Sequence, residues 1–142
     1  MKIDLQQYRK ILNVFLESKT PHVKLSDFDY LDSSEKSIKD DFLFHFQLII
    51  DNGMIGNRNV ETAYTLKDVG IEHDLNGNVY LNIMPLRLTQ IGHDFASSLN
   101  SNEVFKQLKE NFSDEPFKVI LDTGQELLKH YAKKKLDCIL EL

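Results

Sequence analysis

Apolar side chains recur at spacings of three and four residues in several parts of the chain, and the clearest such stretch runs from Ser34 to Ile55. Its apolar positions are Ile38, Phe42, His45, Phe46 and Ile49. This spacing predicts one amphipathic helix. We expect a hydroxyl of Ser33 or Ser34 to cap its first turn, and Gly53 to end it in the left-handed conformation. Met54 and Ile55 should then return to the core.

The same spacing predicts helices on both sides of this segment. The first should begin at Asp4, which can cap it, and run to Ser18 before Pro21. Its expected buried positions are Leu5, Tyr8, Ile11, Leu12, Phe15 and Leu16. Later helices are expected after the capping residue Thr89, over Glu103–Phe112, and from Pro116 to about Leu136 or beyond. Gly124 lies on the apolar stripe of the last helix, where it would let another helix approach closely.

Between residues 55 and 88 the pattern changes to short alternating runs. Ile71–Leu75 and Val79–Ile83 flank Asn76-Gly77-Asn78, which predicts a β-hairpin because Asn and Gly tolerate positive φ. Val60–Leu66 is a weaker candidate strand, and so is His22–Phe28 near the N-terminus.

Together these elements predict an α+β fold. A helix stopped by glycine and followed by strands and a hairpin is typical of a winged helix-turn-helix-like domain, with the hairpin as the wing. By length the chain fits a single domain, residues 1–142. We expect residues 1–100 to form the winged-helix core and residues 101–142 a C-terminal helical extension.

Two segments carry resemblances to known families. Residues 45–55, His-Phe-Gln-Leu-Ile-Ile-Asp-Asn-Gly-Met-Ile, resemble the His-Leu-x-x-Leu-x-x-x-Gly-Leu-Ile signature that ends the recognition helix of many bacterial winged-helix regulators. Phe46 and Met54 stand where that signature has leucine. Residues 87–95, Arg-Leu-Thr-Gln-Ile-Gly-His-Asp-Phe, resemble the Arg-Leu-Thr-x-x-Gly-His-x-Phe segment of an uncharacterised winged-helix family of bacterial and phage proteins. This resemblance implies the fold and transfers no catalytic residues.

Composition narrows the functional classes. The chain of 142 residues has 17 basic and 22 acidic side chains and a formal net charge of −5, which argues against strong sequence-independent binding to nucleic acid. Its one cysteine, Cys138, cannot form an intramolecular disulfide. The N-terminus lacks the apolar run of a signal peptide, and we expect no membrane span. A cytoplasmic protein of bacterial or phage origin is the expectation.

The sequence shows no pattern that supports catalysis. It contains no Gly-rich phosphate loop, nucleophile elbow or paired-carboxylate motif. The five histidines do not pair at metal-ligand spacing, so we expect no metal and no cofactor. His45 lies on a buried stripe, and its simplest interpretation is a core histidine with satisfied hydrogen bonds. A non-enzymatic binding protein is therefore expected.

The first interpretation is a DNA-binding transcriptional regulator, with double-stranded DNA as its partner. Recognition helices present their solvent-exposed side to bases and phosphates. The candidate contacts are Lys36, Gln47, Arg58 and Lys67. Asp40 and Asp51 on the same side of the helix would repel phosphates. A second basic group, Lys129, His130 and Lys133–Lys135, either touches phosphates or only favours the end of its helix and solubility.

A protein partner, such as a host protein, is the alternative. Phe44 and Leu48 are one turn apart and off the main apolar stripe. Either another part of the chain covers them or they form a contact patch. The ending Leu136-Asp137-Cys138-Ile139-Leu140-Glu141-Leu142 is apolar for a terminus, and it favours a homodimer or packing on its own domain.

Overall fold

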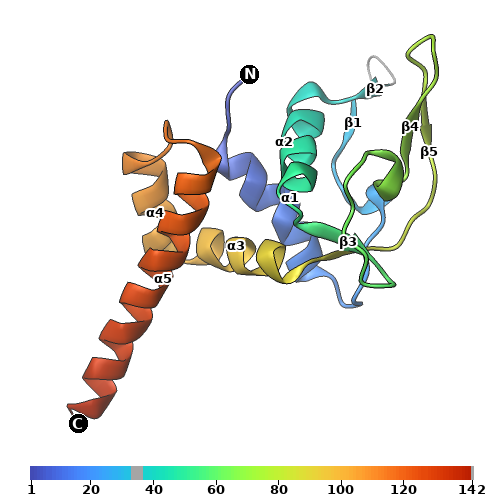
Figure 1. Ribbon diagram of the computed structural model, residues 1–142. Coiled ribbons are helices and arrows are strands. Elements are labelled where there is room, and N and C mark those ends of the chain that lie inside the picture. The colour runs from blue at the N-terminus through green and yellow to red at the C-terminus, as the bar shows by residue number, and fades with distance from the viewer. Residues whose placement is uncertain (33–36, 142) are drawn as a thin grey trace. The chain divides into compact units, whose positions relative to one another are not determined.

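The computed structural model describes residues 1–32 and 37–141 (Figure 1). The chain divides into two compact units, Met1–His93 and Asp94–Leu142. The predicted α+β class is confirmed, because helices are combined with short antiparallel strand pairs. The described strands all belong to the first unit.

Helix α1 (Leu5–Glu17) begins as predicted. Asp4 caps it by accepting a hydrogen bond from the Gln6 backbone N–H at 2.9 Å. Leu5, Tyr8, Ile11 and Leu12 are buried, whereas Leu16 remains 37% exposed. The helix therefore buries the predicted stripe over its first two turns.

Helix α2 (Asp40–Asp51) begins later than the predicted start at residue 34. Strand β2 (Ser37–Ile38) instead pairs with β1 (Leu31–Asp32), so the helical prediction for residues 37–39 is wrong. Ile38 is buried as expected, but from a strand. The two aspartates of the first turn favour a start here, since negative charge stabilises a helix N-terminus. The expected caps Ser33 and Ser34 lie outside the described residues.

The end of α2 matches the prediction. Gly53 has φ +66°. Its N–H donates to the Ile50 carbonyl at 2.9 Å, and the Met54 N–H donates to the Ile49 carbonyl at 3.2 Å. These two bonds form a Schellman stop, which satisfies carbonyls that the helix leaves unpaired. Met54 and Ile55 are fully buried.

Strand β3 (Ile55–Asn57) follows at once and pairs antiparallel with β6 (Leu86–Leu88). Val23 joins the other side of β6, where Val23 and Leu86 exchange two backbone hydrogen bonds of 2.8 Å. The order across this small sheet is therefore Val23, β6, β3. In Figure 1, α1 and α2 lie side by side in the same unit, in agreement with their tertiary contacts.

Two weaker strand predictions are wrong. Within 22–28, only Val23 pairs, and Leu25–Asp27 forms the 3₁₀ helix η1. The Asp27 carboxylate accepts from the Lys24 N–H at 2.8 Å and holds this turn. Residues 60–66 contain one bridge, Thr62 to Gly56, because the chain turns tightly at Val60, which has φ +67°.

The hairpin is confirmed. Strands β4 (Ile71–His73) and β5 (Val79–Leu81) pair with Glu72 opposite Tyr80, and Gly77 has φ +82° in the turn. The 3₁₀ helix η2 (Lys67–Val69) leads into β4. Asp74 fixes the turn by accepting from the Asn76 and Asn78 backbone N–H groups, the Asn78 side chain and the Tyr80 hydroxyl, at 2.8–3.2 Å.

The second unit is helical. Helix α3 (Gln90–Asn100) begins in the first unit and continues into the second, which also holds α4 (Asn102–Asn111) and α5 (Phe117–Leu140). α5 ends at Leu140, in agreement with the prediction of an end near Leu136 or beyond. Gly124 has the predicted role, because a Cβ there would lie 3.0 Å from Ser98 Oγ and 3.4 Å from Leu108 Cδ1.

The two segments that resemble known families, residues 45–55 and 87–95, meet at the end of α2. Thr89 caps α3, since its Oγ1 accepts from the Gly92 N–H at 3.3 Å. The same hydroxyl donates to the Gly53 carbonyl at 2.7 Å, and the Thr89 N–H donates to the Met54 carbonyl at 2.9 Å. A Cβ on Gly92 would run into the Met54 carbonyl oxygen and lie 3.0 Å from Met54 Cβ. Thr89 and Gly92 therefore clamp the helix stop at Gly53.

We expect Gly92→Ala to lower the free energy of unfolding by about 1–3 kcal/mol, because backbone must move to admit the methyl group. Chemical denaturation would measure this loss. Ile91→Ala is the matched control: Ile91 is 52% exposed on the same helix, and its truncation should change stability by about 0.5 kcal/mol or less. Equal stability of Gly92→Ala and the wild type would contradict the clamp.

Candidate functional site

His45 fixes α2 against α1. It is 2% exposed. Its Nε2 accepts from the Asp4 backbone N–H at 2.8 Å, and its Nδ1 lies 2.7 Å from the Asp41 carbonyl oxygen. Because a carbonyl only accepts, Nδ1 is the donor in this bond, and Nε2, which faces an N–H, is the acceptor. The Tyr8 ring meets the imidazole edge to face at 5.3 Å. The predicted core histidine is confirmed.

An aromatic cluster lies beneath α2. The Phe42 and Phe46 rings stack at 5.1 Å, and Phe28 meets them at 5.8 and 5.7 Å. Burial, with a smaller effect from the negative charge of Asp51, raises the pKa of the neighbouring Tyr8 hydroxyl, which therefore stays neutral. This packing sets which side of α2 faces outward.

The outward side of α2, called here the α2 face, consists of Asp40, Asp41, Phe44, Gln47, Leu48 and Asp51. The aspartates and Gln47 are exposed, and Phe44 and Leu48 are half-buried. Three carboxylates thus flank a partly covered apolar pair on one helix. The face carries no basic side chain.

The described lysines near the start of α2 are engaged by Asp29. Lys39 lies 2.8 Å and Lys10 3.2 Å from its carboxylate. Hydrogen bonds from Lys39 and then Lys10 lower the pKa of Asp29. All three groups are well exposed, so salt screens these pairs.

The structure brings only some of the predicted DNA contacts near one another. Gln47 lines a hollow of about 290 Å³ together with Tyr64 and Thr65. Lys67 lines a neighbouring hollow that also includes Tyr64, and its ammonium lies 3.8 Å from Glu72. Arg58 is exposed in the turn after β3. Lys36 lies outside the described residues. No local signal in the sequence indicated that Tyr64, 77% exposed, stands beside Gln47.

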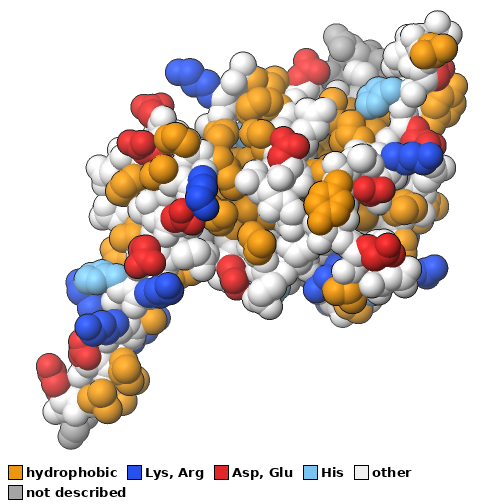
Figure 2. Space-filling view, in the orientation of Figure 1, with side chains coloured by type: hydrophobic (Ala, Val, Ile, Leu, Met, Phe, Trp, Pro, Cys, Tyr) orange, Lys and Arg blue, Asp and Glu red, His pale blue; other side chains and the backbone are white. Residues whose placement is uncertain are grey.

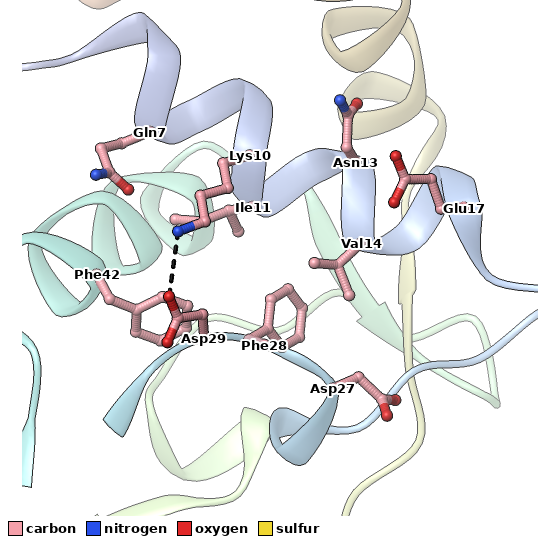
Figure 3. Close-up of a pocket in the computed structure, with 10 residues that line it drawn as sticks. All are labelled: Gln7, Lys10, Ile11, Asn13, Val14, Glu17, Asp27, Phe28, Asp29 and Phe42. Atoms are coloured by element: carbon pink, nitrogen blue, oxygen red, sulfur yellow. Dashed lines mark hydrogen bonds and ion pairs between the residues drawn. The ribbon is translucent and has the colours of Figure 1, made fainter. Parts of the chain in front are cut away.

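A pocket of about 340 Å³ opens between α1 and residues 27–29 (Figure 3). Its floor is apolar, formed by Ile11, Val14, Phe28 and Phe42. The Lys10–Asp29 ion pair crosses its rim, as the dashed line in Figure 3 shows. The Asp27 carboxylate is already bound to the Lys24 N–H. The pocket can take a small apolar group, and its lining offers no nucleophile paired with a base.

The basic group of the second unit follows the far half of α5. Figure 2 shows Lys side chains along this helix, with hydrophobic side chains towards its end. Lys129 lies 3.5 Å from Glu126, one turn away. Leu136, Ile139 and Leu140 are 52–72% exposed.

In the part of the chain that the structure describes, no cluster of His, Cys, Asp and Glu has the arrangement of a metal site. No described helix has both the length and the apolar content that crossing a bilayer requires. Comparison with protein-family models, curated proteins and solved structures finds no match to this chain.

Replacing His45 with Phe should cost about 2–4 kcal/mol of unfolding free energy, because the part-buried Asp4 N–H and Asp41 carbonyl lose their shared partner. Thermal and urea denaturation would measure the loss. Gln47→Ala, on the exposed side of the same helix, should change stability by about 0.5 kcal/mol or less. A His45→Phe variant as stable as Gln47→Ala would rule out the bridging role.

The lowered pKa values of Asp29 and Asp74 should respond differently to salt. Lysine hydrogen bonds lower the first, whereas bonds from the Asn78 side chain and backbone lower the second. NMR titration of the carboxyl carbons should show that salt raises the pKa of Asp29 and leaves that of Asp74 nearly unchanged. Since folding lowers both pKa values, each ionised carboxylate stabilises the folded state above about pH 4. This stabilisation is lost as the pH falls through the pKa of the carboxyl in the folded state. Equal salt responses would contradict the assignment.

Proposed function

We propose that this chain is a non-enzymatic winged-helix protein whose α2 face binds a basic partner protein. The winged-helix assignment is supported by the element order. Helix α1 leads to the Val23 bridge, α2 stands as the recognition helix, and β3 and β6 form the sheet from which the β4–β5 hairpin projects as a wing. The short η1 takes the place of the first helix of a helix-turn-helix. The resemblance of residues 45–55 and 87–95 to bacterial and phage winged-helix families agrees with this assignment.

The negative charge of the α2 face favours a basic protein over DNA as the partner. At least half of protein–DNA hydrogen bonds go to the phosphate–sugar backbone, and the phosphate charges need cations opposite them. The α2 face offers Asp40, Asp41 and Asp51. The two described lysines near the start of α2, Lys10 and Lys39, already form ion pairs with Asp29. A partner with Lys or Arg around an apolar side chain would complement the carboxylates and the Phe44–Leu48 pair.

DNA binding is the second candidate, and the winged-helix arrangement is the observation that favours it. Gln47 would point to base edges and Arg58 and Lys67 to phosphates, with Lys36 at the start of the predicted helix. Dimeric regulators of this kind read paired half-sites. Under this candidate the aspartates would have to lie away from the DNA backbone.

Fluorescence anisotropy on a labelled random duplex separates the two candidates. We expect no saturable binding at about 50 mM salt, where phosphate contacts are strongest. Binding that weakens steeply with salt, and weakens further in Arg58→Ala/Lys67→Ala, would replace the proposal with the DNA candidate.

The protein-binding candidate has its own test, with a labelled amphipathic Lys/Leu helical peptide as probe. At about 50 mM salt we expect NMR shift changes to centre on Phe44, Gln47 and Leu48, and affinity to fall about fivefold in Asp40→Asn/Asp51→Asn. Glu103→Gln/Glu110→Gln removes the same charge from exposed positions of α4 and should bind like the wild type. Equal weakening by both double variants would show non-specific attraction and overturn the assignment of the α2 face.

A further inference from the structure

The β4–β5 hairpin presents a pre-formed strand edge. Four hydrogen bonds to the Asp74 carboxylate hold its turn, one of them from the Tyr80 hydroxyl of β5 itself. The Asn82 side chain donates to Glu72 across the strands at 3.0 Å. The strand is therefore ordered before any partner arrives, which lowers the entropy cost of pairing.

The backbone groups of Val79 and Leu81 point away from β4. The Asn82 N–H donates to the Gly70 carbonyl at 2.8 Å and the Asp74 N–H to the Asn78 carbonyl at 2.9 Å. In antiparallel pairs, bonded positions alternate with positions whose N–H and C=O groups face the other side. Because residues 70 and 82 form one hydrogen-bonded pair and residues 74 and 78 another, the backbone N–H and C=O groups of the odd-numbered residues of β5 face away from β4. Among the described residues this sheet has two strands, so no strand covers that edge of β5.

The side chains on this edge are apolar and uncharged. Val79, Tyr80 and Leu81 are 36%, 56% and 41% exposed, and Ile83 is 83% exposed. Hydrophobic side chains over the hairpin lie at the surface in the upper right of Figure 2. No charged residue occurs from Leu75 to Leu86. Natural sheet edges are usually protected by lysine, proline or a bulge, and β5 has none of these in Val79–Leu81.

We propose that two copies of this chain pair antiparallel through their β5 edges, about a twofold axis at Tyr80, to form a four-stranded sheet. Val79 of one copy lies opposite Leu81 of the other, and each such pair exchanges two backbone hydrogen bonds. Tyr80 lies opposite Tyr80 of the second copy, an aromatic cross-strand pair.

A second copy satisfies this edge better than an unrelated strand for two reasons. The outward groups are symmetric about Tyr80, so the edge complements itself. The strand is neutral in a chain of net charge −5, so self-pairing brings no like charges together at the seam.

A single strand edge buries less than the roughly 1,200 Å² of a standard interface. The dimer should therefore be weak, with a dissociation constant on the order of 100 μM. Sedimentation velocity of the full chain from about 10 μM to 1 mM should show this equilibrium. Over the same range, amide hydrogen exchange at Val79 and Leu81 should slow with concentration. A chain that stays monomeric with both amides unprotected overturns the proposal.

A charge swap at the twofold axis makes the test specific. Tyr80→Lys and Tyr80→Glu each place like charges opposite one another and should weaken self-association about tenfold. An equimolar mixture should recover the dimer, because Lys then faces Glu. Ile91→Lys, an exposed change outside the hairpin, should dimerise like the wild type, and NMR spectra would verify that each variant is folded. A dimer that survives both Tyr80 variants, or a mixture that stays monomeric, shows that β5 is not the seam.

Discussion

The stop of helix α2 at Gly53 is the constraint on which the first unit depends. The Schellman bonds end the helix, and the next residues enter β3 directly. Thr89, which directly follows β6, holds the same turn, with one hydroxyl shared between the Gly53 carbonyl and the first turn of α3. Gly92 leaves the space that this approach requires. A single turn therefore fixes the direction of α2, the register of β3 with β6 and the start of α3.

His45 fixes the buried side of α2 against the start of α1. Its two ring nitrogens connect the Asp41 carbonyl of α2 to the Asp4 N–H that precedes α1. Both partners are backbone groups, so the bond fixes the rotation of α2 as well as its distance. With the stacked Phe42 and Phe46 turned inward, the aspartates and Gln47 must face outward. The acidic character of the exposed face is thus a consequence of how the core is packed.

The two proposed surfaces are independent of each other in chemistry. The α2 face is charged and would draw its specificity from carboxylates, whose attraction is weakened by salt. The β5 edge is neutral and would act through backbone hydrogen bonds and apolar contact. A dimer through β5 would present two α2 faces, so a partner with two binding segments would be held more tightly than one with a single segment.

The sequence by itself determined the features that depend on neighbours within a few residues. The Asp4 and Thr89 caps, the glycine stop and the Asn-Gly hairpin turn all use short-range backbone geometry, and all were predicted correctly. Tertiary structure decided the rest. Ser37 and Ile38 form a strand and not the predicted start of α2, because they pair with Leu31 and Asp32. In the predicted strand 22–28, only Val23 forms a bridge, with Leu86 as its partner. The position of Tyr64 beside Gln47 and the exposed edge of β5 likewise depend on which distant segments of the chain pack against one another. The spacing of side chains along the sequence does not contain this information.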